Sequence, residues 1–457
     1  MPKNTLTRAA MVVAAGMLLS RLSGFVREIS LAGVLGLSRD ADLAVLAISI
    51  PDLLTAMLVG GAAGAVLIPE IHRLGRSEGP SAANELFSQS LAGAAMLGVA
   101  IAGVLALAAP LVVSLLAPGF SGADRGEAVR LVRIVMLALP LCPLAAITSA
   151  ALQSRGRVAL TAVGTLIFNA VLIAAIVALL ARSGVVALAW AVVAAAALRF
   201  ASQLIACARG GMFAGGMTRL VRLTRLRGDL PGRYLMALGA IGLTVAIPVI
   251  ARAMASGDVG SMAAFTYAFK LVELPRGLIV AVLTMVLFPR LSRLFDEGRA
   301  GEGERLIARG TNLILLFTLP VAICFAACAG PVVSLLFERG AVGAGEAARI
   351  AMLARVAFVS LPALGLVTIA MNVFHAHRHT RFPLLATLAV AAVHVAVSAA
   401  VVRPWGDVGL MVTVSAVCWL HCLLLCGGLW WRYRISIFGG MVMRKSVRLE
   451  AGKVTQP

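Results

Sequence analysis

The sequence predicts an all-α polytopic membrane protein of about 12 transmembrane helices. Of its 457 residues, 61% are hydrophobic and only 13% are charged, whereas a typical soluble domain is roughly 25% charged. Apolar stretches of about 20 residues, the length that crosses a bilayer, recur almost from end to end. Lipid must therefore be the solvent for most of this chain, and no large soluble domain fits between the stretches.

Glycine, proline and charged residues separate the apolar stretches and so define the predicted helices. The expected spans are 9–36, 41–71, 86–117, 128–152, 157–181, 185–208, 230–254, 261–289, 305–336, 345–374, 382–402 and 407–431. Several spans contain proline, including Pro51, Pro140 and Pro362. Membrane helices tolerate proline where neighbouring helices satisfy the freed carbonyls, so we expect kinks at these positions.

Short sequence matches at nearly one spacing indicate an internal repeat. Val-Val-Ser-Leu-Leu at 112–116 recurs at 332–336, an offset of 220, and Leu139-Pro140 returns as Leu361-Pro362 at an offset of 222. An even number of helices per unit makes the repeat parallel, and transporters use such lobes to enclose a central cavity. The predicted units are an N-terminal six-helix lobe at 1–208, a basic cytoplasmic linker at 209–229, a C-terminal six-helix lobe at 230–432 and a cytoplasmic tail at 433–457.

The distribution of Lys and Arg predicts the orientation. The net charge of +20 is concentrated in alternate connecting segments and in the C-terminal tail, and the richest segment is 209–233. The positive-inside rule therefore places both termini in the cytoplasm. The basic surplus is a topology signal with some affinity for anionic lipid headgroups, so we expect membrane lipids, and no nucleic acid, as partners.

A small set of charged residues falls within the predicted spans. The basic members are Arg21, Arg27, Arg133, Arg199, Lys270, Arg276 and Arg355, and the acidic members are Glu28, Asp52 and Glu273. Each charge costs roughly 2.5–3.5 kcal/mol at the bilayer centre, so such residues normally face a cavity or a partner. We interpret Arg199 as snorkelling to the headgroups from a cytoplasmic helix end. We expect Glu273 to pair with Lys270 or Arg276, its neighbours three residues away.

The first helix carries the most informative charges. Arg21 and Glu28 are seven residues apart and so share a helix face, with Gly24 leaving a gap beside them. Guanidinium groups bind oxyanions through paired N–H donors, so Arg21 and Arg27 suit a diphosphate in a water-accessible cavity. The alternatives are snorkelling to a headgroup or an internal ion pair with Glu28.

The residue patterns disfavour other chemistries. The sequence has no nucleophile–base pattern and no Walker loop, so we expect neither an enzyme nor an ATP-driven pump. Cys418, Cys422 and Cys426 share a helix face with His421 nearby. Apolar packing of these thiols is favoured over a metal site, and we expect no metal and no cofactor.

The motifs resemble those of one transporter family. The string Ser20-Arg-Leu-Ser-Gly-Phe-Val-Arg-Glu28 is similar to the opening signature of the MurJ (MviN) lipid II flippases, in the MATE-like MOP superfamily. Leu116-Ala-Pro-Gly-Phe120 and Phe337-Glu-Arg-Gly340 follow in the expected order, so the resemblance covers nearly the whole chain. It implies a bacterial inner-membrane protein of peptidoglycan and cell-wall biogenesis. Such a protein moves lipid II, an undecaprenyl-diphosphate-linked precursor, from the inner to the outer leaflet by alternating access.

The resemblance also assigns site residues. It implies diphosphate binding by Arg21, Arg27 and Lys270, the last standing where the family usually has Arg. Gly24, Glu28, Asp42, Asp52 and Glu273 are the expected supporting or gating residues, and Asp42 matches an acid near the outer end of the second helix. The implied partners are the lipid-linked glycan and, as candidates, cell-wall synthesis proteins.

The chain departs from the family pattern in ways that keep alternatives open. Thr55 and Ala56 stand where the family usually has a basic pair. Family members generally carry two further helices that line a groove for the polyprenyl tail, so tail binding is expected to differ here or to use a partner. The alternatives are a flippase for another polyprenyl-diphosphate glycan, a MATE-type drug exporter, which the basic cavity candidates disfavour, and a non-transporting cell-wall scaffold.

The predicted spans offer no carboxylate cage for a coupling ion. Span 230–254 has no deep acid and span 382–402 offers only His394 and hydroxyls. We therefore expect cycling driven by membrane potential without a sodium site.

Overall fold

The computed structural model describes residues 3–58, 63–213, 247–282, 287–377 and 381–437, with residues 232, 234, 242 and 379. Within these residues the structure is helical and has no strand, which confirms the predicted all-α class. The N-terminal half contains α1 (Lys3–Leu35), α2 (Arg39–Met57), α3 (Ala63–Ser77), α4 (Pro80–Leu107), α5 (Ala109–Leu116), α6 (Gly122–Val135), α7 (Leu141–Ser154), α8 (Val158–Ala175) and α9 (Ala181–Arg209). The C-terminal half contains the apolar helix Ile247–Gly257, then α11 (Ser261–Val282), α12 (Phe288–Asp296), α13 (Ala300–Phe337), α14 (Ala344–Phe358), α15 (Leu361–Ala376) and α16 (Arg381–Tyr433).

Local sequence signals define the turn between α1 and α2. Gly36 follows α1 with φ +60°, a left-handed conformation that favours glycine. Ser38 then caps α2, where its hydroxyl accepts a hydrogen bond from the backbone N–H of Ala41 (3.2 Å). Asp40 and Asp42 lie in the first turn of α2, where carboxylates complement the helix dipole.

Several predicted spans are broken rather than continuous. The span 128–152 divides into α6 and α7 before Leu141, and the span 345–374 divides into α14 and α15 at Leu361. Pro140 and Pro362 lie at these two breaks because proline lacks the N–H that would continue the helix. Since the two prolines are equivalent in the repeat, both halves contain the same broken helix. Gly406, with φ +55°, likewise separates two stretches of α16, where the sequence predicts a boundary.

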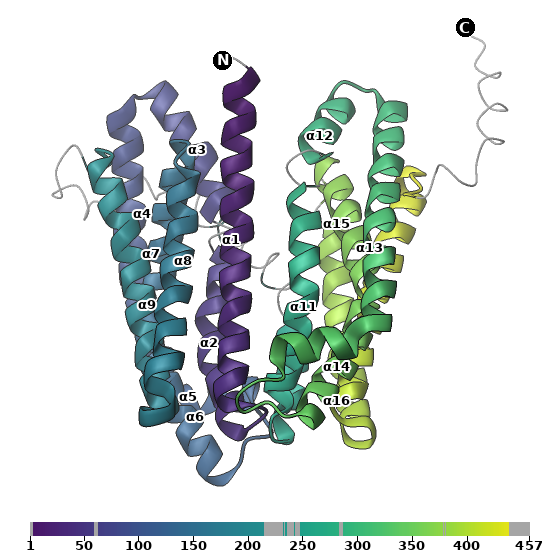
Figure 1. Ribbon diagram of the computed structural model, residues 1–457. Coiled ribbons are helices and arrows are strands. Elements are labelled where there is room, and N and C mark those ends of the chain that lie inside the picture. Colours follow the sequence, from purple (N-terminus) through teal and green to yellow (C-terminus); the bar gives the residue numbers. More distant parts are fainter. Residues whose placement is uncertain are drawn as a thin grey trace, which may run out of the picture.

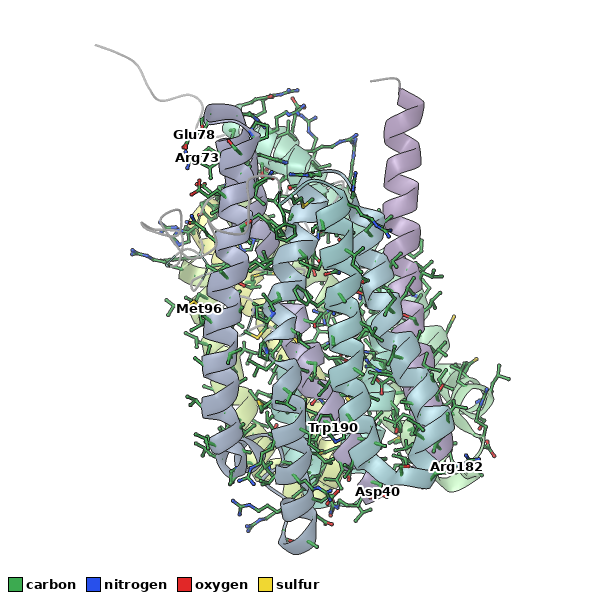
Figure 2. All side chains as sticks on the ribbon, turned by 90° about the vertical axis from the view of Figure 1, so that its left-hand side faces the viewer. Asp40, Arg73, Glu78, Met96, Arg182 and Trp190 are labelled. Carbon is green, nitrogen blue, oxygen red and sulfur yellow. The ribbon has the colours of Figure 1, made fainter. Side chains whose placement is uncertain are left out.

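The outer surface is typical of a lipid-facing protein. Seven helical segments of the described chain are long and apolar enough to cross a membrane, while the count of twelve stays a prediction. Met96 on α4 and Trp190 on α9 point outward and are 67% and 53% exposed. Figure 2 shows Arg73 and Glu78 near one end of the molecule and Asp40 and Arg182 near the other. Exposed apolar residues between two charged ends match a bilayer's hydrocarbon core and its polar surfaces.

The N-terminal and C-terminal halves lie side by side and meet at one end (Figure 1). At the end of the molecule where α1 finishes, the backbone N–H of Ala341 donates to the carbonyl of Gly33 (2.8 Å). Gly340 has φ +63° and lies so close to the Gly33 carbonyl that a Cβ would overlap it. The backbone N–H of Leu37 donates to Glu346 Oε1 (3.2 Å). Toward the end where α1 begins, the ribbons of the two halves diverge.

The predicted domain boundaries stay predictions. The helices of 1–208 and 230–432 fall on the two sides of the molecule where they are described. Most of the predicted linker 209–229, from residue 214 onward, lies outside the described residues, as does the predicted tail after Ile437.

Candidate functional site

Arg27 on α1 is the centre of a buried polar network. Its guanidinium is 2% exposed, and its Nη2 atom donates to Glu28 Oε1 and to Asp52 Oδ2 on α2, both at 2.7 Å. Its Nη1 atom donates to Asn169 Oδ1 on α8 (3.1 Å), and the Asn169 amide donates in turn to the Ser23 hydroxyl (2.8 Å). Two carboxylates therefore neutralise Arg27 within the N-terminal half, and Glu28 pairs with Arg27 rather than with Arg21.

The space beside Gly24 is occupied. A Cβ on Gly24 would stand 3.7 Å from Asn169 Nδ2, an ordinary contact distance. The expected gap in the face of α1 is thus filled by the side chain of Asn169 from α8. The sequence could not indicate this because it does not say which helix packs against Gly24.

Arg21 is exposed and extends from α1 to the C-terminal half. Its guanidinium lies against Gly277 of α11, where a Cβ would overlap it. Glu273 and Arg276 of the same helix lie within electrostatic range. Gly277 therefore makes room for Arg21, which is exposed whereas Arg27 is buried.

Lys270 and Glu273 of α11 complete the charged cluster. Lys270 Nζ and Glu273 Oε2 form an ion pair at 2.8 Å, which confirms the predicted pairing of Glu273. Lys270 lies within electrostatic range of Asp52 and Glu28 across the boundary between the halves. Arg252, on the helix before α11, is in range of Glu273, Asp52 and Glu28. The cluster therefore has more basic groups than carboxylates, so a net positive charge remains for an anion. Its basic members are Arg21, Arg27, Arg252, Lys270 and Arg276, and its carboxylates are Glu28, Asp52 and Glu273.

Asp42 lies elsewhere, at the closed end of the molecule. It is fully buried, and its carboxylate accepts hydrogen bonds from the backbone N–H groups of Gly260 (2.8 Å) and Ala263 (3.0 Å). These donors begin α11, so Asp42 caps a helix of the opposite half. Arg39 pairs with Asp42 (3.3 Å) and donates to the carbonyl of Ser256 (3.0 Å). Asp42 therefore lies at a contact between the two halves and not in the Arg21 cluster.

The expectation for Arg199 is wrong. Its side chain is 4% exposed and donates through Nη1 to the Thr55 hydroxyl (3.3 Å) instead of reaching a headgroup. Among the described residues its Nε and Nη2 atoms have no partner. The cause is helix rotation: Arg199 lies on the face of α9 that packs against α2 and α7, and a sequence position near a helix end does not reveal that face.

Sequence reasoning missed Arg252 and Asn169 as site residues. Arg252 lies two residues from the end of a predicted span, where a basic side chain ordinarily reaches the membrane–water interface. Asn169 is uncharged, so it does not stand out among the intramembrane charges. Its position 142 residues after Arg27 gives no local signal, although an amide in the middle of an apolar span is unusual.

The cysteine cluster of α16 gives no metal site. Cys422 and Cys426 place their sulfur atoms 3.8 Å apart, while His421 lies 3.2 Å from the Thr387 hydroxyl. In the part of the chain that the structure describes, no group of three His, Cys, Asp or Glu side chains is placed to hold a metal ion.

The sequence model of the family described as "Lipid II flippase MurJ" matches residues 31–448 of this chain. Among curated proteins, the probable lipid II flippase MurJ of Rhizobium tropici is 27% identical over 479 residues, covering 98% of this chain and 88% of that protein. The lipid II flippase MurJ of Burkholderia cenocepacia is 25% identical over 466 residues, covering 96% and 88% respectively.

Solved structures share the fold. A structure of lipid II flippase MurJ in an inward closed conformation superposes with a TM-score of 0.78 at 17% identity, covering 92% of this chain and 87% of that one. An inward-facing multidrug resistance MATE family transporter of the MOP superfamily gives a TM-score of 0.75 at 15% identity, covering 95% and 100%. With a family match over most of its length and charged residues from both halves gathered on α1, α2 and α11, the chain belongs to the lipid II flippase MurJ family.

Proposed function

We propose that this inner-membrane protein moves lipid II from the inner to the outer leaflet by alternating access. The observation that carries the proposal is the position of Arg21, which reaches from α1 to Gly277 of α11 and so joins basic groups of both halves. An anionic diphosphate held there touches both halves, and its binding can be coupled to their relative movement. Net positive charge also favours an anionic headgroup over the cations of a drug exporter. Cell-wall synthesis proteins that make or use lipid II are the candidate protein partners.

The basic residues take different roles in this proposal. Arg21 is the direct ligand of the diphosphate, because it is exposed and guanidinium matches phosphate oxygens. Arg27 and Lys270 are paired with carboxylates in this conformation. In this conformation they contribute positive electrostatic potential. Their N–H donors become free to bind substrate only when the halves rearrange and the ion pairs break.

The conformation suits loading from the cytoplasm. The halves are bonded at the end that holds Asp42 and Gly340, and they diverge where α1 begins. With the N-terminus in the cytoplasm, as the Lys and Arg distribution predicts, the diverging end faces the leaflet in which lipid II is made. Release on the outer side then requires Asp42 to give up the N-terminus of α11.

Flipping in proteoliposomes tests the function. We expect the purified protein to expose labelled lipid II to an external enzyme, faster under an imposed potential and unchanged by a sodium gradient. Each elementary charge crossing 100 mV contributes roughly 2.3 kcal/mol. This is enough for the membrane potential to drive the empty, positively charged site back toward the cytoplasm. Undecaprenyl-diphosphate carrying an O-antigen unit is the comparison substrate. If it is flipped as fast as lipid II, the protein has a broader glycan specificity. Strict dependence on sodium at zero potential would refute potential-driven cycling.

Topology is a second expected outcome. Reporter fusions at Pro457 should show cytoplasmic activity, and protease should cleave the segment 209–233 only from the cytoplasmic side. A fusion at Gly122, the first residue of α6, is the matched control and should report the periplasm. A periplasmic signal at Pro457 would mean an odd number of spans and would contradict the predicted topology.

A further inference from the structure

A basic groove lies between α12 and the first turns of α13. Figure 1 shows α12 at the end of the molecule where α1 begins. It has a volume of about 680 Å³ and shares no lining residue with the Arg21 cluster. Its charged lining consists of Arg290, Arg293, Arg299, Arg305 and Arg309, with Glu297 and Glu302.

The walls of the groove are held by a tight helical hairpin. Gly298 turns the chain between the helices with φ +70°. Gly303 then packs against the ring of Phe295, where a Cβ would stand 2.8 Å from Cε1. Leu291 and Ile307 are fully buried beneath the hairpin. Four of the arginines are therefore presented by two packed helices, and Arg299 by the turn between them.

Most of the positive charge in the groove is uncompensated. Arg299 engages both acids, through Glu302 Oε1 (2.8 Å) and Glu297 Oε2 (3.1 Å). The other four arginines form no ion pair among the residues that the structure describes. They are spaced i,i+3 on α12 and i,i+4 on α13, so each pair shares a helix face and repels. An anion bound between the helices removes this repulsion.

The groove stands at the level of the lipid headgroups. Arg309 is one helical turn, about 6 Å along the axis, before Leu313 on α13. Leu313, Leu316 and Phe317 are 47%, 70% and 59% exposed and begin the lipid-facing surface of that helix. The polar layer of a bilayer is roughly 5–7 Å thick on each side, so Arg309 lies within it. Arg305 is one turn further from Leu313, and its long side chain can reach the phosphate groups from there.

We propose that this groove binds the phosphate headgroups of anionic phospholipids. Guanidinium groups take phosphate oxygens through paired donors, and basic pockets at the membrane surface recognise anionic headgroups in this way. Leu294 and Leu306, which also line the groove, offer apolar contact to the acyl chains that accompany such a headgroup. The bound lipid fixes the α12–α13 hairpin at the membrane surface while the two halves move.

Lipid retention on the purified full chain tests the proposal. Native mass spectrometry in detergent would be used to titrate phosphatidylglycerol and, as the neutral comparison, phosphatidylcholine. We expect selective retention of phosphatidylglycerol, weakened about 30-fold in the double variant Arg305→Gln/Arg309→Gln, at about fivefold per charge. Arg305→Lys/Arg309→Lys should retain most of the binding. The matched control is Arg73→Gln/Arg76→Gln, two arginines of the same end in the N-terminal half, which should bind like the parent.

Two results would overturn the proposal. One is equal retention of phosphatidylglycerol by the Arg305→Gln/Arg309→Gln variant and the parent, with both eluting as folded protein. The other is displacement of the lipid by millimolar inorganic phosphate, which would assign the groove to free phosphate. If the double glutamine variant does not fold, the single variant Arg309→Gln decides: binding about fivefold weaker than the parent supports the groove, and equal binding overturns it.

Discussion

Arg21→Ala is expected to abolish growth when it is the only copy of the gene, while the protein remains inserted and abundant. Arg21 is exposed and no described ion pair within the fold depends on it, so its loss leaves no buried charge unpaired. Loss of one charge-assisted partner of a bound diphosphate costs about 2 kcal/mol or more, at least roughly 30-fold in affinity. Arg21→Lys should also be impaired because an ammonium lacks the paired donors. The measurement is complementation together with lipid II flipping.

Gly277→Ala tests the same site from the opposite half. The added methyl group overlaps the Arg21 guanidinium and must displace it, so we expect flipping to fall while abundance is unchanged. Gly103→Ala is the matched control, since the Cβ at this helical glycine meets no atom within 4 Å. Arg73→Ala controls for loss of an exposed arginine outside the site. Normal growth on Arg21→Ala would remove Arg21 from the proposed site.

Arg27→Ala should behave differently and lower the amount of folded protein. It leaves the carboxylate of Glu28, 3% exposed, without its partner and removes a bond to Asp52. Breaking a buried ion pair by removing one member costs about 3–5 kcal/mol, because the remaining charge is uncompensated. We expect a lower unfolding temperature and less protein in the membrane, measured by fluorescence-detected gel filtration of the heated protein.

A combined variant separates stability from transport. Arg27→Met/Glu28→Gln/Asp52→Asn removes all three charges, so folding should recover relative to Arg27→Ala while flipping stays low. If Arg27→Ala alone is as abundant and heat-resistant as the parent but inactive, Arg27 is a direct substrate ligand like Arg21. Arg27 would then have to be free of its carboxylates in the loading conformation.

The sequence by itself determined the fold class and singled out most of the charged residues of the candidate site. Hydrophobic spans are readable because each must be about 20 residues long and nearly free of charge to cross lipid. The same cost makes every intramembrane charge conspicuous, so Arg21, Arg27, Lys270 and Glu273 are found without a structure. Prolines such as Pro140 and Pro362 even indicate where helices break, because a missing N–H is a local property.

Only the tertiary structure decided which of these charges is accessible. Arg21 and Arg27 are six residues apart on one helix, yet Arg27 is neutralised by Glu28 and Asp52 while Arg21 extends to Gly277. Arg199 is buried although its position near a helix end suggests exposure. Helix rotation and packing partners set these outcomes, and both depend on contacts between segments far apart in the chain. The energy of a charge in the membrane depends on those contacts, and they cannot be read from a local pattern of residues.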